Sequence, residues 1–335
     1  MNFLIYAVIA LFLIAAALIA RIFLLTQNLS VKKYEMVDKK ANNFNGILMI
    51  LFLVFGFIGL YLVTKAYTIR DVYAFESASE HGPLIDGLFN VTLLTIGIVF
   101  ILTNILLFYF AYKYRYKEGA KAYYFTHSNK LEIIWTIIPA IVMCYLVIEG
   151  GIVWNKVMMT DPPENAYLIE VTAKQFAWKI RYPGKDGKLG KTIHKLRTPE
   201  NELGLDPNDP AAQDDIIVGG ASGYYIPVNQ PVLLKINALD VLHSVFLPHF
   251  RVKMDAVPGV PTQFCFTPNV TTEEMRKKVS NDDFNFEMAC AELCGKSHFA
   301  MKGVVIVDDI AKVNEWLNAK KPFFESLKDN QVASL

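Results

Sequence analysis

Long apolar runs fill the first half of the chain. The runs that carry no charged residue are residues 1–20, 41–64 and 87–112. A fourth run, residues 133–154, contains Pro139 and one acidic residue, Glu149, which partner helices or the membrane interface can accommodate. A helix that crosses a bilayer needs about 20 mostly apolar residues, so we predict four transmembrane helices. Buried core helices of a soluble protein fit four such runs poorly.

Charges in the connecting loops predict the orientation. The loops at 26–46 and 113–132 are rich in Lys and Arg, whereas residues 65–86 lean acidic. The positive-inside rule places both basic loops in the cytoplasm, so residues after about 156 lie on the outer side of the membrane. The first run lacks a preceding basic segment and an evident cleavage site. We therefore expect it to stay as a helix and not to be removed as a signal peptide.

The second half of the chain changes to short runs of β-forming residues separated by turns. We predict one long strand at Tyr167–Tyr182, followed by a Pro-Gly turn cluster. Further strands are predicted at Pro231–Asn237, Val241–Leu247, Thr262–Thr267, Phe284–Cys290 and Met301–Val307. Strands at this spacing indicate a β-sandwich or a small Greek-key barrel, and residues 309–327 have helical periodicity.

Composition and charge narrow the function classes. The chain has 335 residues, is 53% hydrophobic and has a mean hydropathy of +0.30, which is too apolar for one soluble globule. A net charge of +1 argues against nucleic acid as the main partner, because a phosphate-tracking surface needs concentrated Lys and Arg. The acidic stretch Leu196–Asp215 is predicted to be a long surface loop that is either merely solvated or steers a basic partner.

Soft metal ligands gather near the C-terminus. Within twelve residues the chain offers two thiols, Cys290 and Cys294, the imidazole of His298 and the thioether of Met301. One more ligand, His243, stands in an upstream β-type run. Thiolate, imidazole and a weak thioether form the copper electron-transfer combination. The second Cys provides enough sulfur to bridge a second metal ion.

Three other interpretations of this cluster stay open at this point. Cys290 and Cys294 could form a disulfide, since the predicted topology puts them in an oxidising compartment. The thiols and imidazoles could hold a structural zinc, although zinc has no use for Met301. His243 and Met301 could also be ordinary core residues, which is improbable for the whole set together.

The chain resembles a known family at these residues. The string Cys290-x-Glu292-x-Cys294-Gly-x-x-His298-x-x-Met301 resembles the CuA signature of cytochrome c oxidase subunit II. So do the upstream segments Asp240-Val-Leu-His243-Ser-Val-Phe-Leu-Pro248 and Lys253-Met-Asp255-Ala-Val-Pro258-Gly259. Glu132-Ile-Ile-Trp135-Thr-Ile-Ile-Pro139 is similar to the start of that family's second membrane helix. The resemblance covers roughly residues 88–320.

The resemblance implies a fold and a division into domains. The fold would be membrane α-helical hairpins with four transmembrane helices, plus an all-β cupredoxin-like Greek-key domain. The domains would be two extra N-terminal helices at 1–66, a hairpin at 87–156 that packs on subunit I, a periplasmic CuA domain at 160–320 and a tail at 321–335. The two extra helices would make this a bacterial variant of the family.

The resemblance also implies a role for each candidate ligand. Cys290 and Cys294 would bridge two coppers through their sulfurs. His243 and His298 would each terminate one copper. This arrangement would hold the coppers close together, so that one electron is shared between them and little reorganisation accompanies each transfer.

Two further ligands follow from the same resemblance. Met301 would be a weak axial ligand to one copper, and the backbone carbonyl of Glu292 would bind the other. The Glu292 carboxylate would reach toward a magnesium ion at the contact with subunit I. Haem would be held only by that partner subunit, because the membrane helices of this chain have no cluster of histidines.

Residues outside the copper signature are expected to take part in proton uptake and electron entry. Glu132 lies where a basic cytoplasmic loop enters a membrane helix, and the resemblance makes it the entrance of a proton pathway; the alternative is an interfacial carboxylate paired with Lys130. The segment 173–178 aligns with an aromatic segment that accepts electrons in many relatives. Trp178 is retained there, but Phe176 stands where a tryptophan is expected, and core packing is the alternative for both.

Two other potential ligands are expected to play no part in the site. His249 is close in sequence to His243 but has no counterpart in the signature, so we expect it at the surface. Cys265 alternates with Phe264 and Phe266, so we expect it in a strand.

The function implied is subunit II of a proton-pumping haem-copper oxygen reductase in a bacterial inner membrane. It would accept electrons from a c-type cytochrome, which could be soluble or membrane-attached, and pass them to haem in subunit I, where oxygen is reduced. Its partners would be subunit I, other oxidase subunits and the lipid bilayer. The competing classes are a membrane-tethered copper carrier, a quinol-oxidising relative, which would lack the copper ligands, and a nitrogen-oxide reductase with the same copper site.

Overall fold

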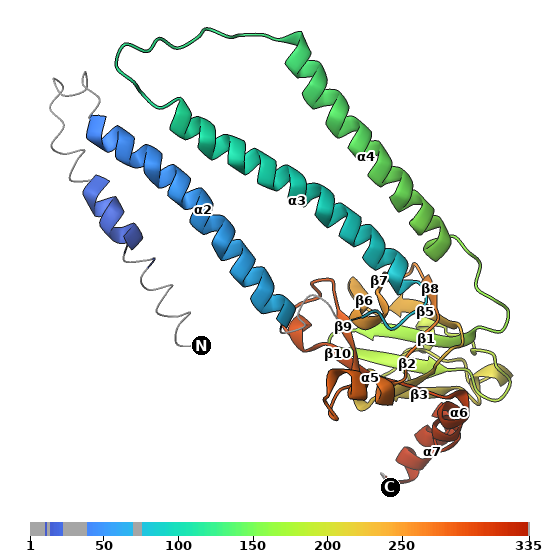
Figure 1. Cartoon of the computed structure of the whole chain (residues 1–335). Coiled ribbons are helices and arrows are strands. Elements are labelled where there is room, and N and C mark those ends of the chain that lie inside the picture. The colour runs from blue at the N-terminus through green and yellow to red at the C-terminus, as the bar shows by residue number, and fades with distance from the viewer. Residues whose placement is uncertain (1–10, 12–13, 23–38, 70–75, 334–335) are drawn as a thin grey trace. The chain divides into compact units, whose positions relative to one another are not determined.

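The computed structural model describes residues 11, 14–22, 39–69 and 76–333 (Figure 1). Among them, three helices are long and apolar enough to cross a membrane: α2 (Lys39–Ile69), α3 (Gly82–Lys113) and α4 (Asn129–Met158). Three of the four predicted membrane helices are therefore confirmed as long apolar helices. Most of the first predicted helix lies outside the described residues, and its residues 14–22 are helical.

Polar side chains on α3 satisfy their hydrogen bonds within the helix. The hydroxyls of Thr92, Thr95 and Thr103 and the amide of Asn104 each donate to the carbonyl four residues earlier, at 2.7–2.9 Å. Hydrocarbon offers no hydrogen-bond partner, so a polar group on a lipid-facing helix needs such a bond within the protein. These bonds explain how α3 tolerates these four polar residues among its exposed apolar side chains.

Contacts within the chain form two groups. One joins residues 1–70 with 96–128, and the other joins residues 71–95 with 129–335. In the first group α2 and α3 lie side by side. Phe52 faces Phe108 with ring centroids 5.4 Å apart, and Phe57 faces Phe100 at 6.4 Å. Since the contact partners run in opposite order along the chain, the two helices are antiparallel.

The second group contains a β-sandwich of two five-stranded sheets. The first sheet has the order β3-β2-β1-β5-β8. Its strands are β1 (Tyr167–Lys174), β2 (Ala177–Tyr182), β3 (Ile216–Gly219), β5 (Val232–Ala238) and β8 (Thr262–Phe266). β1 pairs with β2 antiparallel and with β5 parallel, so this sheet is mixed.

The second sheet carries the order β4-β10-β9-β6-β7. Its strands are β4 (Tyr224–Pro227), β6 (His243–Leu247), β7 (Val252–Ala256), β9 (Phe286–Cys290) and β10 (Lys302–Asp308). The ends of β6 and β9 meet in this sheet, because Val245 pairs with Cys290 in antiparallel register. This pairing brings an upstream histidine near a downstream cysteine.

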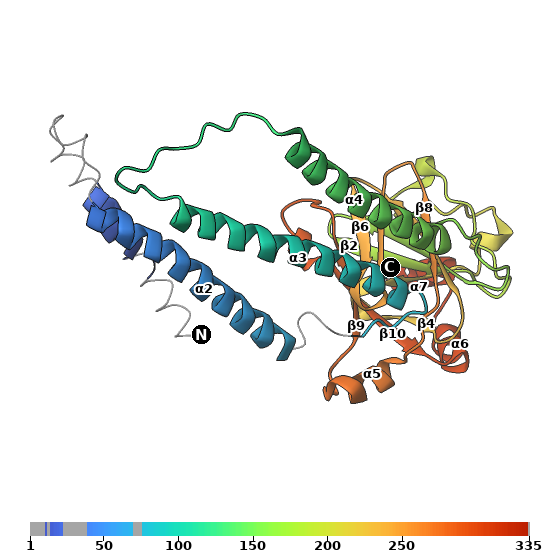
Figure 2. The same ribbon diagram turned by 45° about the horizontal axis from the view of Figure 1, so that its top comes forward.

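The two sheets enclose one hydrophobic core. Its largest fully buried side chains include Trp178, Ile180, Tyr224, Leu247 and Phe286. Three short helices complete the domain: α5 (Thr272–Val279), α6 (Ile310–Asn318) and α7 (Phe323–Ala333). The C-terminal end of α4 contacts β8, as the turned view also shows (Figure 2). The predicted all-β sandwich and the helical tail are confirmed.

The prediction of one long strand at Tyr167–Tyr182 is wrong. The segment is a hairpin of β1 and β2 that turns at Gln175 and Phe176, and its two strands pair from Lys174–Ala177 outward. An apolar run interrupted by only two residues gives no turn signal of the Gly, Pro or Asn type, so the pattern did not indicate the turn. Sequence analysis also missed β3, β4, β7 and α5, although Thr271 and Glu274 form a capping box at the start of α5.

The acidic stretch Leu196–Asp215 is only partly a solvated surface loop. Leu203 and Leu205 are buried, and Asp215 is fully buried, with its carboxylate accepting a hydrogen bond from Arg181 at 2.7 Å. Burial raises the pKa of Asp215, although the Arg181 guanidinium opposes that shift. Glu202 forms ion pairs with Lys174 and Lys179. Two of the six acidic side chains are therefore paired inside the domain and contribute less to any steering of a partner.

An ion pair attaches the start of α3 to the β-sandwich. The Arg251 guanidinium donates to both carboxylate oxygens of Asp86, at 2.6 and 3.0 Å. The backbone of Ala78 donates to the carbonyl of His249 at 2.7 Å, and the Ser79 hydroxyl donates to that of Phe250 at 2.7 Å. Arg251 has a φ of 57°, a left-handed conformation that is unfavourable for a residue other than glycine. The strained residue thus makes a bidentate bond that positions a membrane helix.

His249 is not at the surface as predicted. Its ring is half-buried and meets the edges of Phe284 and Phe286, with centroids 5.2 and 5.5 Å away. Burial lowers the pKa of His249, and the nearby Arg251 charge lowers it further, against a smaller raising effect of Glu287. The residues next to His249 in sequence gave no sign of this packing, because Phe284 and Phe286 come from a distant part of the chain. Cys265 lies in β8, as predicted.

Candidate metal centre

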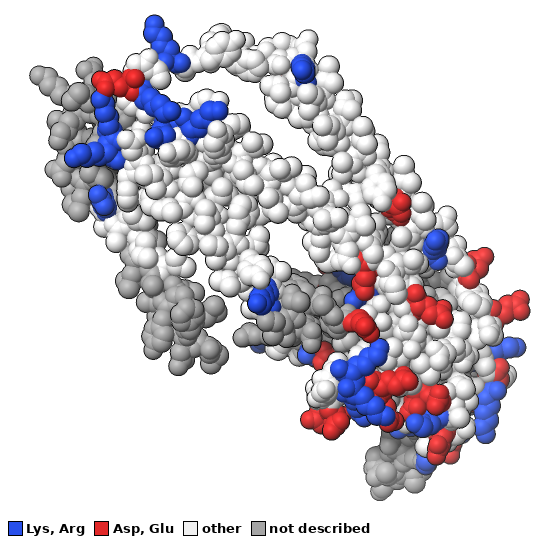
Figure 3. All heavy atoms as spheres, viewed as in Figure 1, with Lys and Arg blue, Asp and Glu red and all other residues white. Residues whose placement is uncertain are grey.

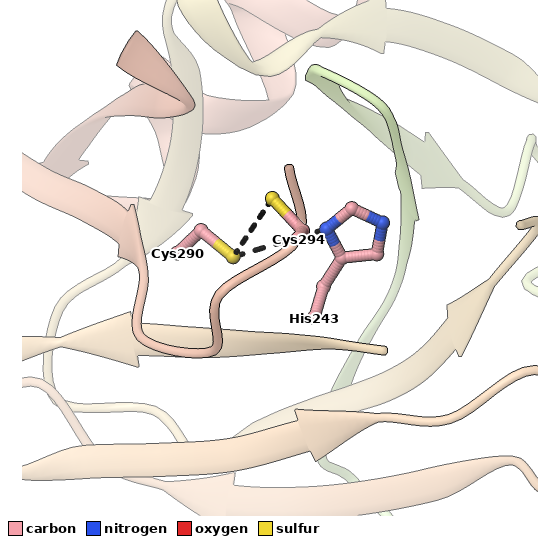
Figure 4. A group of neighbouring side chains, drawn as sticks. All are labelled: His243, Cys290 and Cys294. Atoms are coloured by element: carbon pink, nitrogen blue, oxygen red, sulfur yellow. Dashed lines mark hydrogen bonds between the residues drawn. The ribbon is translucent and has the colours of Figure 1, made fainter. Parts of the chain in front are cut away.

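Two strand ends and one loop form the candidate metal centre. His243 is the first residue of β6 and Cys290 the last residue of β9, and the loop that follows β9 carries Cys294. The Ala291 amide donates to the Ser244 carbonyl at 3.0 Å, which anchors the loop to β6. Figure 4 shows that the side chains of His243, Cys290 and Cys294 point toward one another.

The sulfur and nitrogen atoms of this group lie within reach of a shared metal. The sulfurs of Cys290 and Cys294 are 3.8 Å apart, and the His243 Nδ1 is 3.8 Å from the Cys290 sulfur. The backbone carbonyl oxygen of Glu292 lies 3.1 Å from the Cys290 sulfur. All four cysteines of the chain are free, and therefore the interpretation of Cys290 and Cys294 as a disulfide is not supported.

The remaining two predicted ligands approach the other sulfur. The His298 Nδ1 lies 3.6 Å from the Cys294 sulfur, and the Met301 Sδ lies 3.9 Å from it. The backbone of Met301 is also bonded to the end of β9, because its carbonyl accepts a hydrogen bond from the Cys290 amide at 3.2 Å. The structure thus brings potential donor atoms of all six residues that sequence analysis singled out close to one of the two cysteine sulfurs.

Most of the donor atoms are shielded from water. His243 is fully buried, Cys290, Cys294 and Met301 are at most 8% exposed, and His298 is half-buried. Burial, with the neighbouring Cys290 thiol, raises the pKa of Cys294 to about 11. The Cys294 thiol therefore keeps its proton at neutral pH until a metal displaces it. Such a buried cluster of sulfur and imidazole suits a soft metal ion held away from solvent.

Asp240 orients the imidazole of His243. Its carboxylate oxygen Oδ1 accepts hydrogen bonds from the His243 Nε2 at 2.9 Å and the Val241 amide at 2.7 Å, and Oδ2 accepts from the Gln175 amide at 2.7 Å. Partial burial acts to raise the pKa of Asp240, but these hydrogen bonds lower it below its ordinary value. With Nε2 donating to Asp240, the His243 Nδ1 is left free to accept a metal.

The turn between β1 and β2 covers the cysteine loop. The Gln175 amide side chain donates to the Cys294 carbonyl at 2.6 Å. Gly295 has a φ of 136°, and a Cβ there would lie 3.0 Å from the Gln175 Nε2 and 3.1 Å from the Phe176 ring. The Phe176 ring therefore rests on the backbone of the metal loop, and only glycine allows this approach. Phe176 is half-buried.

Trp178 lies beneath the site and not on the surface. It is 2% exposed, its indole N–H points to the Met301 carbonyl at 3.4 Å, and its ring meets that of His243 edge-on at 6.2 Å. Of the two aromatic residues singled out for electron entry, only Phe176 has access to solvent. Trp178 packs in the core, as the alternative interpretation stated, and it supports two candidate ligands.

Exposed apolar side chains border the metal ligands. Leu242, Leu293 and Phe299 are 50%, 78% and 81% exposed, and each is adjacent in sequence to a candidate ligand. The Glu292 carboxylate is also exposed, next to the buried Cys290 and Cys294. Apolar groups that gather on a surface beside a functional site are typical of a protein interface.

Glu132 lies away from the metal centre. It is in the first turn of α4 and is exposed, at the end of the helix opposite to the one that contacts β8. Gln175, Asp240 and Gly295 lie within the motifs described above, but sequence reasoning assigned none of them a function. Asp240 could have been identified from its position three residues before His243, a candidate ligand. Histidines that bind a metal usually donate their other N–H to a carboxylate or a similar acceptor.

Two family models match the chain. The model described as "Cytochrome C oxidase subunit II, transmembrane domain" matches residues 68–149. The model described as "Cytochrome C oxidase subunit II, periplasmic domain" matches residues 169–308. The second range contains all six candidate metal ligands, and the first contains Glu132. Residues 1–67 are outside both ranges.

Similar proteins carry the same family description. The chain is 33% identical over 239 residues to the alternative cytochrome c oxidase subunit 2 of Bradyrhizobium diazoefficiens, covering 71% of this chain and 81% of that relative. It is 29% identical over 284 residues to cytochrome c oxidase subunit 2 of Thermostichus vulcanus, covering 77% and 83%. A solved structure, the periplasmic domain of subunit II of cytochrome oxidase of Bradyrhizobium japonicum, matches with 25% identity and a TM-score of 0.32 over 47% of this chain and 95% of that domain.

Proposed function

The chain belongs to the cytochrome c oxidase subunit II family, and on that basis we propose that it is subunit II of a proton-pumping haem-copper oxygen reductase. In this role it accepts electrons from a c-type cytochrome and passes them to haem in subunit I. The observation that carries the proposal is the gathering of two imidazoles, a thioether and a backbone carbonyl around two neighbouring buried thiols.

The donor set fits a centre of two copper ions. Cys290 and Cys294 would supply two thiolates to this centre, and His243 and His298 would supply two imidazoles. Met301 and the Glu292 carbonyl supply weaker donors. When bound, the copper centre takes up and releases one electron at a time. Soft sulfur and imidazole donors select copper over hard cations, and the thioether distinguishes the set from a structural zinc site.

The surrounding residues keep the ligands in place. Asp240 holds the His243 ring, Trp178 supports the Met301 carbonyl, and Gln175 holds the Cys294 carbonyl. These contacts come from three different strands and turns, so the ligands have little freedom to move. A site that moves little during oxidation and reduction favours fast electron transfer, which suits a chain that acts as an electron relay.

Electron entry is assigned to the surface around Phe176. Phe176 is half-buried and in contact range of the loop that carries Cys294, and Gly295 permits that approach. Trp178 continues inward from Phe176 to His243 and Met301. A c-type cytochrome that docks at this surface would place its haem edge near the metal ligands.

The membrane segment serves the partner subunits. The long apolar helices α3 and α4 form the hairpin that packs on subunit I, and Glu132 at the cytoplasmic end of α4 is the entrance of a proton pathway into it. The Glu292 carboxylate is exposed and would be available to bind a magnesium ion at the contact with subunit I. The basic loop 113–128 orients the chain in a bacterial inner membrane with the β-domain in the periplasm.

The proposal is tested on the purified oxidase complex by copper analysis, haem spectroscopy and electron paramagnetic resonance. The unmodified complex should contain haem and show a mixed-valence two-copper signal. Cys294→Ser should abolish that signal, whereas the matched variant Cys265→Ser should retain it, because Cys265 lies in β8 outside the site. Copper without co-purifying haem would favour a membrane-tethered copper carrier, and zinc in place of copper would refute the relay.

A further inference from the structure

A groove between α2 and α3 is not used by the proposed relay. It has a volume of about 360 Å³ and is lined mainly by apolar residues of both helices: Phe52, Leu53, Gly56, Phe57, Leu60, Phe100, Asn104 and Phe108. A Cβ added at Gly56 would meet nothing within 4 Å, so this glycine opens the groove instead of closing a helix contact. The Asn104 amide donates to the Phe100 carbonyl at 2.8 Å, which satisfies one of its two N–H groups inside α3. This bond lowers the cost of covering Asn104 with an apolar ligand.

The same two helices end in a cluster of basic side chains. Residues 39–46 and 113–128 carry six Lys and Arg residues against one acidic residue, Glu118, which pairs with Lys39. Figure 3 shows basic side chains gathered over the ends of α2 and α3. Arg115 is held by a stacking contact with Tyr112, 4.3 Å from the ring centroid, and by a hydrogen bond to the Asn43 side chain at 3.0 Å. The cluster therefore carries a net positive charge, and contacts with Tyr112 and Asn43 hold Arg115 in position.

The depth of the groove matches one leaflet of a bilayer. Phe108 precedes Lys113 by five residues and Phe100 precedes it by thirteen, which is about 8 Å and about 20 Å along a helix. The hydrocarbon of one leaflet is about 15 Å thick. A molecule with its headgroup at Lys113 would thus have its acyl chain at the depth of the groove. Tyrosine residues near Lys113 (Tyr109, Tyr112, Tyr114 and Tyr116) mark the interface level.

We propose that this groove and basic cluster form a binding site for one anionic phospholipid. Lys113, Lys117 and Arg115 hold the phosphate headgroup, and an acyl chain lies between the Phe52–Phe108 and Phe57–Phe100 pairs over Gly56. The negative headgroup complements the basic cluster, and the site requires only that α2 and α3 span the membrane. It goes beyond the copper relay, and its ligand would fix α2, which precedes the region shared with the family, against α3.

The site is tested by photolabelling of the intact oxidase complex in nanodiscs of phosphatidylcholine. Small amounts of a phosphatidylglycerol or a phosphatidylcholine with a photoactivatable group in the acyl chain are added, and labelled peptides are identified by mass spectrometry. The anionic probe should label peptides containing 52–60 and 100–108 at least about fivefold more than the neutral probe, since each basic side chain near a lipid surface contributes about that factor.

Two pairs of variants separate the groove from general attraction to the membrane. The double variant Lys113→Gln, Lys117→Gln should remove most of the preference for the anionic probe. Lys156→Gln, in the last turn of α4 and outside the basic cluster, should retain it. Gly56→Leu should fill the groove and reduce labelling by both probes, whereas Gly59→Leu, on the same helix but outside the groove lining, should not. The copper signal reports independently that each variant has assembled.

Three outcomes overturn the proposal. Equal labelling by both probes in the unmodified complex would mean that the basic residues only orient the chain. Labelling that Gly56→Leu leaves unchanged would place the lipid elsewhere on the helices. Absence of labelling at 52–60 and 100–108 by either probe would mean that a protein segment fills the groove, either from residues 1–22 or from a partner subunit.

Discussion

Replacing Asp240 by Asn tests how the protein controls His243, a candidate metal ligand. The Asp240 carboxylate accepts three hydrogen bonds, two at Oδ1 from Val241 and His243 and one at Oδ2 from Gln175. An asparagine amide has one acceptor oxygen and one NH2 group. Whichever way the amide is turned, its NH2 group faces an N–H donor, so at least one of the three hydrogen bonds is lost. The negative charge that stabilises the ligating imidazole is lost as well.

The size of the effect follows from these contacts. A hydrogen bond to a charged group contributes about 1.5–3 kcal/mol. The Asp240 side chain is 32% exposed, so water replaces part of the loss, and we expect the apo-protein to lose about 1–2 kcal/mol of stability. Groups that orient a metal-ligating histidine contribute about 10–100-fold in metal affinity. Copper affinity should therefore fall at least about tenfold, and the reduction potential should rise because a neutral acceptor donates less electron density to the imidazole.

Copper affinity is measured by competition with a chelator, and the potential by spectroelectrochemical titration of the complex. The matched control is Asp282→Asn, an exposed carboxylate in the loop after α5, which should change neither quantity. The reasoning is refuted if Asp240→Asn binds copper as tightly as the control and keeps its potential. Loss of all copper would also contradict it, because the ligands themselves remain.

Three further predictions concern residues that the fold brings together. Gly295→Ala should cost about 2–3 kcal/mol in the free energy of unfolding measured by chemical denaturation, because its φ of 136° is strained for alanine and the new Cβ meets the Phe176 ring at 3.1 Å. Arg251→Gln should lower stability by about 1–2 kcal/mol, measured by thermal unfolding, because it breaks the bidentate pair with Asp86. Burial first, and then the charge of Arg251, lower the pKa of His249 below its ordinary value of 6.5, so the unfolded chain takes up a proton before the folded one. The contribution of His249 to stability is therefore present above about pH 6.5 and is lost as the pH falls, and His249→Phe should flatten the melting temperature between about pH 7 and pH 5.

Each of these predictions has a matched comparison. Gly187→Ala also has a positive φ, 68°, but its Cβ meets nothing within 4 Å, so it should cost only about 1 kcal/mol; an equal cost at Gly295 would argue against the contact with Phe176. Lys277→Gln breaks an exposed ion pair with Glu273 and should have almost no effect, and Arg251→Gln must exceed it. An unchanged pH profile in His249→Phe would assign the acid sensitivity to other groups.

Local features of the chain were accessible from the sequence. Runs of 20 or more apolar residues predict membrane helices because the bilayer imposes a minimum length, and α2, α3 and α4 follow those runs. The spacing of Cys290, Cys294, His298 and Met301 predicted a metal loop because these ligands are close in the chain and one loop can bring them together. The resemblance to the subunit II family rested on the same local motif, and the family is confirmed.

Contacts between distant segments were decided only by the tertiary structure. The hairpin turn at Gln175 places that residue on the Cys294 carbonyl, 119 positions away, and buries Trp178 beneath Met301, 123 positions away. Nothing in the residues around Asp215 indicated that Arg181 would bury it. The groove between α2 and α3 likewise depends on which faces of two apolar helices meet. Metal ligands that one loop can bring together are predictable from their spacing in the sequence. The burial and orientation of side chains are not, because they depend on which distant segments pack together and exclude water.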